Sequence, residues 1–224
     1  MLNKKTSTIA IIDSGIGGVS VLRQLIAKYN AGNYIYFADN LFMPYGNKSK
    51  SFVSKRINKI VDELNEKYKV DHIFIACNTA STCIDVTKFT NVTTMQFNKK
   101  HAYFTTKRTS LNLPHINAIS DKTLANNIEK NIFKSEKLLK IVEKHALKHH
   151  LQKKNEIILG CTHYELVISL FEKLCPNTKF IKNSEFIVNN INFEFVSKDL
   201  NLIVLTSKKD SILEDKISKL TFNK

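Results

Sequence analysis

The sequence predicts an α/β protein built around a mainly parallel sheet with both faces covered. Short apolar runs alternate along the chain with amphipathic stretches, as strands and helices do in such folds. One local pattern also occurs twice, in HIFIACNTAS (72–81) and EIILGCTHYE (156–165). Each copy is an apolar run followed by a cysteine, polar residues and a helical stretch, which suggests two facing acid/base cysteines at strand ends.

The first half of the chain alternates between the two element types. TIAII (8–12), YIYFA (34–38) and HIFIA (72–76) are apolar runs of strand length. Between them, residues 19–29 and 49–68 have apolar side chains at helical spacing. The side chains expected on the inner face of the second helix are Phe52, Ile57, Ile60, Val61 and Leu64.

The middle of the chain is less regular. Residues 92–98 and 102–106 have strand character, and residues 111–120 form either a loop or a short strand. Residues 121–151 have a helical pattern and are rich in Asn, Lys and His. EIILG (156–160) then restores the strand pattern.

The C-terminal part returns to alternation. Residues 164–174 predict a helix that ends before Pro176. The remaining expected elements are strands at 179–181, 193–196 and 202–206 and a helix at 210–220. Because no linker or low-complexity segment interrupts the chain, any second domain must be inserted between elements of the first sheet.

The composition is that of a globular protein with an excess of positive charge. Hydrophobic residues make up 43% of the chain and charged residues 24%, both ordinary values. The 34 Lys and Arg against 20 Asp and Glu give a formal net charge of +14. The excess lysines are scattered and no RNA- or DNA-binding signature accompanies them, so a solvated surface is favoured over a nucleic-acid partner.

Cysteine usage indicates a reducing compartment. The four cysteines form neither a CxxC pair nor a zinc-like spacing, so no metal site is predicted. Cys83 and Cys175 are interpreted as structural residues. The N-terminal segment has only a short apolar run, which fits neither a signal peptide nor a membrane span. These features predict a cytoplasmic protein that does not enter a membrane.

The segment DSGIGG (13–18) is a candidate anion-binding loop. It follows a strand and opens a helix, and its successive N–H groups suit a carboxylate or phosphate. It lacks the GxGxxG spacing, which argues against a dinucleotide. Asp13 and Ser14 either serve a ligand or cap the helix. The later segment MPYG (43–46) is a turn or a second part of the same site.

Cys77-Asn78-Thr79 and Cys161-Thr162-His163 are the central pair of motifs. A lone buried cysteine is usually a small apolar residue, but two in matching contexts favour function. A helix N-terminus or a nearby histidine lowers the pKa of a thiol, which suits a general base, and an opposing protonated thiol suits a general acid. His163 either tunes Cys161 or binds a ligand.

These four motifs, DSGIGG, ADN…PYG, ACNTAS and LGCTHY, occur in this order and resemble the glutamate racemases of the aspartate/glutamate racemase superfamily. The resemblance implies two pseudo-symmetric parallel-sheet α/β domains with the active site in the cleft between them. It also implies a racemase without cofactor, in which one cysteine removes the α-proton of glutamate and the other protonates the opposite face. Glutamate is then the expected small-molecule partner, and a homodimer is one alternative for the oligomeric state.

By the same resemblance, Cys77 and Cys161 are the catalytic pair, assisted by Asp13 and His163. The implied substrate-contact positions are Asp13, Ser14, Tyr45, Gly46, Asn78, Thr79, Thr162 and His163. In the second domain, Glu129 is a candidate for an inward-facing acid, and Thr105 or Thr106 for a substrate-contacting threonine.

The chain departs from the family pattern between its two cysteine motifs. This interval is short, and MQFNKKHAYF (95–104) stands where the family carries a Glu-Pro-Gly turn. We therefore expect a first domain over 1–96 and 186–224 and a shortened second domain over 97–185.

Three functions fit these observations. The first is a glutamate racemase that supplies D-glutamate for peptidoglycan precursors. The second is a racemase of aspartate or another acidic amino acid. The third is a binding or regulatory protein on the same fold without activity.

Overall fold

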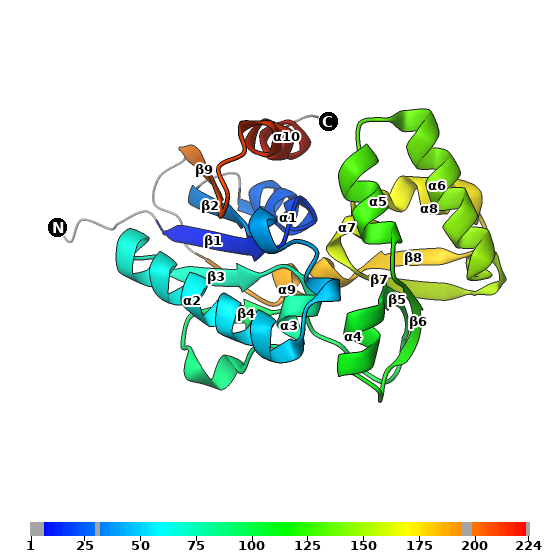
Figure 1. Cartoon of the computed structure of the whole chain (residues 1–224), viewed down its shortest axis with the longest axis horizontal. Helices are drawn as coiled ribbons and strands as arrows, with labels where there is room; N and C mark the ends of the chain where they lie inside the picture. Colours follow the sequence, from blue (N-terminus) through cyan, green and yellow to red (C-terminus); the bar gives the residue numbers. More distant parts are fainter. Residues whose placement is uncertain (1–6, 30–31, 194–198, 223–224) are drawn as a thin grey trace.

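The computed structural model describes residues 7–29, 32–193 and 199–222, which form two lobes, each around its own parallel sheet (Figure 1). Sheet A consists of β1 (Thr8–Asp13), β2 (Gly32–Ala38), β3 (His72–Ile75), β4 (Val92–Thr94) and β9 (Leu200–Thr206). Its strand order is β4-β3-β1-β2-β9, and every neighbouring pair is parallel. The chain therefore leaves this sheet after β4 and returns to its other edge as β9.

Sheet B is built from the stretch of chain between β4 and β9. It consists of β5 (Ala102–Thr106), β6 (Asn117–Asp121), β7 (Glu156–Gly160) and β8 (Lys179–Lys182). Its order is β6-β5-β7-β8, again parallel throughout. The predicted fold class, two parallel-sheet α/β domains, is confirmed. The predicted division at residues 96 and 186 stays a prediction, and the membership of the two sheets supports it.

Helices cover both faces of sheet A. They are α1 (Val19–Tyr29), α2 (Lys50–Tyr68), α3 (Asn78–Ser81), α9 (Asn183–Asn189) and α10 (Ser211–Phe222). In β1, Ile9 and Ile11 point into the core shared with α1, α9 and α10, while Ala10 and Ile12 point into the core under α2. Because both faces of the strand are buried, its apolar run is continuous.

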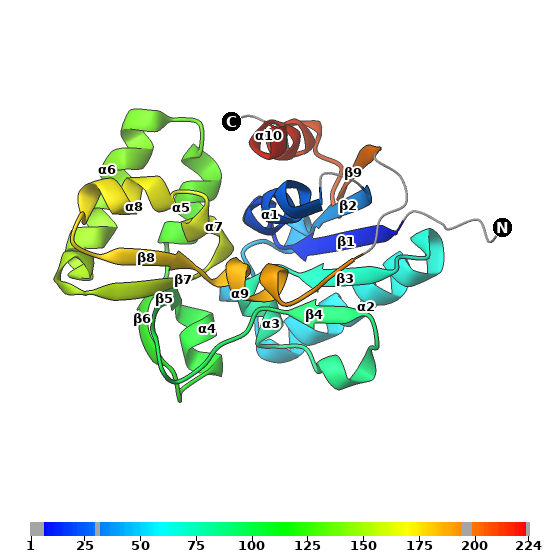
Figure 2. The ribbon, with the colours of Figure 1, turned by 180° about the vertical axis from the view of Figure 1, so that it is seen from behind.

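The helices of the second lobe are seen from both sides in Figures 1 and 2. They are α4 (Lys107–Asn112), α5 (Leu124–Asn131), α6 (Ser135–Lys148), α7 (Thr162–Glu165) and α8 (Ile168–Leu174). A large core joins Phe104, Ile157 and Leu159 to the α5, α6 and α8 side, whereas a small cluster around Tyr103 and Ile158 fills the opposite face.

Several predicted elements differ in detail from the structure. The helix expected over 121–151 is two helices, α5 and α6, and the one over 164–174 is α7 and α8. The strand expected over 92–98 ends at Thr94, and residues 111–120 contain the start of β6, so the strand alternative is correct there. Of the strand expected at 193–196, Phe193 lies outside any strand and residues 194–196 lie outside the described residues.

One core residue of α2 was predicted wrongly. Phe52 is 37% exposed, and Val53 is buried in its place. Ser49 caps this helix by accepting the Phe52 N–H at 3.2 Å, which fixes Phe52 in the first turn at the edge of the sheet. The other four predicted positions, Ile57, Ile60, Val61 and Leu64, are buried as expected.

Candidate active site

A cavity of about 340 Å³ lies where the two sheets meet. Its walls are the loops after β1, β2 and β3 of sheet A and the loops after β5, β6 and β7 of sheet B. Ligands of parallel α/β sheets bind outside the carboxyl ends of the strands, because the connecting loops and helix starts converge there. The cavity therefore has the position of a ligand site between two domains.

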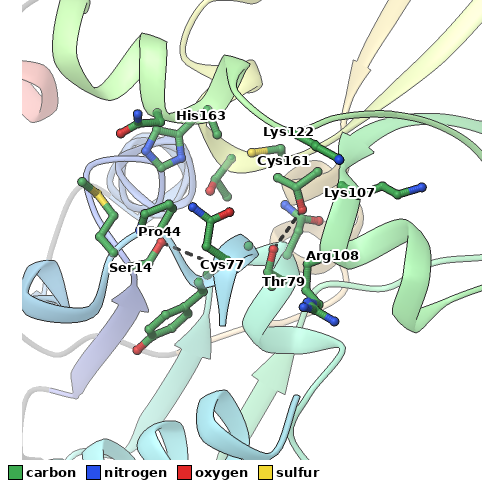
Figure 3. A pocket seen from close by; sticks show the side chains of 18 of the residues that line it. Ser14, Pro44, Cys77, Thr79, Lys107, Arg108, Lys122, Cys161 and His163 are labelled. Atoms are coloured by element: carbon green, nitrogen blue, oxygen red, sulfur yellow. Dashed lines mark hydrogen bonds between the residues drawn. The ribbon is translucent and has the colours of Figure 1, made fainter. Parts of the chain in front are cut away.

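The two motif cysteines both line this cavity (Figure 3). Cys77 follows β3 and precedes α3, and Cys161 follows β7 and precedes α7. Their exposed fractions are 7% and 5%, so each sulfur is largely shielded from bulk water. The repeated sequence pattern thus corresponds to two thiols delivered to one cavity by two different sheets.

Cys77 is held as a neutral thiol. Burial raises its pKa far above the usual value, and the negative charge of Asp13 raises it further. The Ser14 hydroxyl lies 3.9 Å from its sulfur. The expectation that a helix start lowers the pKa of this cysteine is wrong for Cys77: α3 is only one turn long, and desolvation outweighs its N–H groups.

Cys161 has a different electrostatic environment. Burial lowers the pKa of His163, but hydrogen bonds with Cys161 and Glu129 outweigh it and leave the pKa well above 6.5. The His163 Nε2 lies 2.6 Å from Glu129 Oε2. Burial also raises the pKa of Glu129, yet its bond with His163 and the Ile16 N–H at 3.0 Å bring the pKa below its ordinary value. A protonated His163 therefore lies beside the Cys161 sulfur.

Asp13 lies behind the cavity wall rather than in it. It is fully buried, and it is not among the described residues that line the cavity. Its carboxylate accepts the Gly15 N–H at 2.9 Å and the Thr162 hydroxyl at 3.0 Å. Burial raises the pKa of Asp13 to about 6, against the lowering effect of the His163 charge. Asp13 thus ties the loop after β1 to the Cys161 motif.

The other predicted contact residues do line the cavity. They are Ser14, Tyr45, Gly46, Asn78, Thr79, Thr162 and His163. The Tyr45 hydroxyl, however, donates to Asp39 at 2.5 Å, and Arg56 donates to the same carboxylate, so the phenol anchors its loop. Asn78 accepts from Asn183 through Oδ1 at 2.8 Å, and among the described residues its buried Nδ2 has no partner.

The chain is similar over most of its length to proteins named glutamate racemase. It is 30% identical to a glutamate racemase of Buchnera aphidicola over 89% of both chains. In structure it resembles the glutamate racemase of Campylobacter jejuni, with a TM-score of 0.79 and 24% identity over 97% of this chain and 99% of that one. No protein-family model matches the chain.

The chain belongs to the glutamate racemase family. The predicted resemblance and the prediction of an amino-acid racemase, an isomerase, are confirmed. The fold also matches the Escherichia coli glutamate racemase in complex with L-glutamate and activator UDP-MurNAc-ala, with a TM-score of 0.77 and 22% identity over 96% of each chain. Among the described residues, no helix of this family member is long and apolar enough to cross a membrane.

The second lobe of this racemase-family chain contributes residues that the sequence left open or did not reveal. Glu129, the candidate for an inward-facing acid, lines the cavity and pairs with His163. Thr106 lines the cavity and lies 3.1 Å from Thr79, whereas Thr105 is fully buried. The residues missed are Lys107, Arg108 and Lys122, which also line the cavity. The available signal was position, since all three lie within two residues after a strand end.

One cluster in the described part of the chain has the residue types of a metal site. Asp121, His145 and His149 have ligand atoms within 4.8 Å of one another. The Asp121 Oδ2 lies 2.8 Å from His145 and 2.7 Å from His149, whereas two ligands of one tetrahedral zinc ion stand roughly 3.3 Å apart. Lys148 also donates to this oxygen at 3.4 Å. These distances suit hydrogen bonds and an ion-pair network, so we assign no metal here.

Proposed function

We propose that this chain interconverts L- and D-glutamate without a cofactor, by proton exchange between Cys77 and Cys161. The observation that carries the proposal is that both thiols line one cavity and come from different sheets. Their environments also differ in the way that acid/base chemistry needs. Cys77 is held as a thiol by burial, and Cys161 stands beside a protonated His163.

The proposed exchange moves one proton at each face of the substrate. The Cys161 thiolate takes the proton from Cα, and the electron pair left behind is delocalised into the adjoining carboxylate. The Cys77 thiol then gives its proton to the opposite face of Cα, which inverts the centre and leaves a Cys77 thiolate. The opposite enantiomer is converted by the same steps in reverse.

Polar groups around the thiols are suited to hold the ends of an amino acid. The Asn78 Nδ2 is a buried donor without a partner among the described residues, and Asn78 lines the cavity. The hydroxyls of Thr79, Thr162 and Ser14 lie on the same walls. A buried donor without a partner is costly, so a carboxylate that accepts from it gains binding free energy.

The test is racemisation of L-glutamate, followed as D-glutamate formation without added pyridoxal phosphate. Cys77→Ala and Cys161→Ala should each lower kcat by about 10³-fold or more, because each removes one proton carrier. Cys83→Ala and Cys175→Ala are matched controls, since these buried free cysteines lie outside the cavity lining. Full activity in Cys77→Ala would contradict the two-thiol mechanism.

We further propose that the product supplies peptidoglycan precursors in the cytoplasm. Two observations support this role: the E. coli relative binds an activator named UDP-MurNAc-ala, and all four cysteines here are free. Expression of the chain should restore growth of a bacterial strain that requires D-glutamate, and the Cys77→Ala variant should not. Growth restored equally by both would contradict this role.

A further inference from the structure

We propose that Lys216 of α10 is a positioning residue for the Glu129–His163 pair and acts on this pair from the first lobe. The inference rests on the proposed function, because the histidine that this pair keeps charged stands beside Cys161. The Lys216 ammonium donates to the Glu129 carbonyl at 3.1 Å, across the junction of the two lobes. Figures 1 and 2 show α10 at the side of the first lobe that faces α5. Lys216 is not among the described residues that line the cavity, so its effect must pass through Glu129.

The packing of α10 fixes the place from which Lys216 extends. Leu213 and Ile217 of this helix are buried in the core of the first lobe, and Asp210 accepts the Leu213 N–H at 3.0 Å at the start of the helix. Lys216 lies one turn after Leu213 and is half-buried. A long cationic side chain in such a position keeps its stem against apolar surface and extends its ammonium to a polar group. Here that group belongs to the second lobe.

The carbonyl that Lys216 reaches lies at the C-terminal end of α5. Backbone carbonyls in the last turn of a helix lack partners within the helix and carry partial negative charge. Glu129 is in the last turn of α5, so the ammonium satisfies one of these carbonyls. Ile132, which directly follows α5, also packs against the core that holds Leu213 and Ile217. The end of α5 is therefore seated on the first lobe by a hydrogen bond and by an apolar contact.

The buried side chain of Glu129 depends on the positive charge around it. Its Oε2 accepts the Ile16 N–H at 3.0 Å and lies 2.6 Å from His163 Nε2. Burial raises the pKa of Glu129, whereas its hydrogen bonds, the His163 charge and the Lys216 charge lower it, and the lowering effects prevail. Lys216 thus holds the backbone of Glu129 and, from outside the cavity, favours the ionised form of its side chain.

Further titratable groups lie around Glu129 on neighbouring elements. Asp13 at the end of β1 and Glu129 each disfavour the negative charge of the other. The Tyr36 hydroxyl on β2 is neutral, because burial and the two carboxylates raise its pKa well above 10. On α6, which packs against α5, the buried His145 is bound at 2.8 Å to the carboxylate at the end of β6. The repulsion from Asp13 is therefore what remains when the Lys216 charge is removed, and Glu129 then takes up a proton more easily.

The experiment follows the Glu129 carboxyl by carbon NMR against pH in the full chain, with Glu129→Gln to assign the signal. Lys216→Met keeps an apolar stem but removes the charge and the donor, so the midpoint of this titration should rise by about 0.5 to 1 pH unit. Lys216→Arg should restore the midpoint, because a guanidinium keeps both. The matched control is Lys219→Met, which removes an exposed lysine of the same helix that pairs with Asp215. Its Glu129 midpoint should match the wild type.

Racemisation of L-glutamate provides the second readout. Lys216→Met should lower kcat by about 3-fold to 10-fold and change KM by less than about 2-fold, since Lys216 lies outside the cavity lining. In a Glu129→Gln background, the same change should lower kcat by less than about 2-fold, because the carboxylate through which Lys216 acts is gone. The backbone carbonyl at position 129 remains in this background, so a purely structural helix cap would cost as much there as in the wild type.

The outcomes separate this inference from the proposed function. An unchanged Glu129 midpoint in Lys216→Met, or equal losses of kcat in the wild-type and Glu129→Gln backgrounds, would overturn the role of Lys216 and leave the racemase intact. The same shift of the midpoint in the Lys219→Met control would overturn it as well. A midpoint that Lys216→Met shifts and Lys216→Arg restores, in a chain without any racemisation, would instead support the role of Lys216 and overturn the proposed activity.

Discussion

At the scale of single residues, the two cysteines are alike in sequence context and unlike in electrostatics. Cys77 is buried and lies near the Asp13 carboxylate, and both features favour the neutral thiol. Cys161 has a buried imidazolium two residues along the chain, held in place by Glu129. The proton exchange proposed above needs one thiol that gives a proton and one that takes it, so the two surroundings differ in the sense that the proposal requires.

Glu129 is the residue that maintains this asymmetry. In Glu129→Gln the side chain keeps its size but loses the charge that raises the pKa of His163, so His163 should lose its proton at lower pH. We expect kcat to fall by about 10-fold to 100-fold and the alkaline limb of the pH profile to move to lower pH. The measurement is kcat against pH for L-glutamate.

The control for this prediction is Glu136→Gln, which removes the same charge from an exposed position at the start of α6. Its pH profile should match the wild type. A Glu129→Gln profile with unchanged midpoints would show that the carboxylate does not act through His163.

The glycine at position 17 is required by the close approach of His163. A Cβ on Gly17 would lie 2.6 Å from His163 Nδ1, whereas a Cβ on Gly46 would meet no heavy atom within 4 Å. Gly17→Ala should cost about 1–3 kcal/mol of unfolding free energy through overpacking. Gly46→Ala should stay within about 0.5 kcal/mol of the wild type. Urea unfolding measures both, and equal losses would contradict the packing argument.

At the scale of secondary-structure elements, Asp121 joins three elements of the second lobe. From the end of β6 it caps α5 by accepting the N–H groups of Thr123 at 2.7 Å and Leu124 at 2.9 Å. It also binds His145 and His149 at the C-terminal end of α6. Burial raises the pKa of this carboxyl, but six hydrogen-bond donors around it outweigh burial and hold the pKa well below 3.8. These donors are the N–H and hydroxyl of Thr123, the N–H of Leu124, and the side chains of His145, Lys148 and His149.

Asp121→Asn should therefore destabilise the protein by about 2–4 kcal/mol at neutral pH, since it removes a cap and an ion-pair acceptor together. The pKa of Asp121 is lowered on folding, so its contribution is present above the unfolded value near 4 and is lost as pH falls below it. The difference in unfolding free energy between the wild type and Asp121→Asn, measured by urea unfolding, should become smaller at acidic pH. Asp62→Asn, at an exposed position on α2, is the control that should show no such difference.

At the scale of the whole molecule, the site is complete only when the two lobes are docked. Asp13 accepts from Thr162, and the Ile16 N–H donates to Glu129. Lys216 of α10 also donates to the Glu129 carbonyl at 3.1 Å. Each of these bonds joins a residue of the first lobe to Thr162 or Glu129 of the second lobe. Residues that the proposed mechanism uses are thus also residues that hold the lobes together.

The sequence predicts much of this arrangement for physical reasons. Parallel strands buried on both faces are continuous apolar runs, so β1, β2, β3 and β7 could be located from composition alone. Each cysteine lies at the carboxyl end of a strand of its own sheet, and the two sheets meet at the cavity that both cysteines line. The breaks between α5 and α6 and between α7 and α8 lack Gly or Pro signals, so the sequence pattern could not reveal them. Lys107, Arg108 and Lys122 line the cavity but are not distinguished in the sequence from the many surface cations.

A last consequence of the docked lobes concerns Glu165, which is buried where α7 meets α1 and α9. Its carboxylate accepts from Ser184, through the hydroxyl at 2.5 Å and the N–H at 3.1 Å, and Gln24 of α1 donates to the same hydroxyl. Burial raises the pKa of Glu165 from 4.5 to about 7, against the lowering effect of these bonds. In the native state the group therefore keeps its proton at pH values where the unfolded chain has released it.

Because this pKa is raised on folding, the contribution of Glu165 to stability is full below about pH 4.5 and is lost as pH rises through about 7. Glu165→Gln keeps the neutral form at every pH, so it should match the wild type near pH 4.5 and exceed it near pH 7.5 by on the order of 2–3 kcal/mol. The pKa of Asp13 is also raised on folding, so its contribution to stability falls with rising pH in the same way. Because Asp13 is present in both proteins, this contribution cancels when their unfolding free energies are compared. Urea unfolding at the two pH values measures this difference, with Glu172→Gln at an exposed position of α8 as the control. A difference that does not change with pH would mean that Glu165 is already ionised between the lobes at neutral pH, with Ser184 as sufficient compensation for its charge.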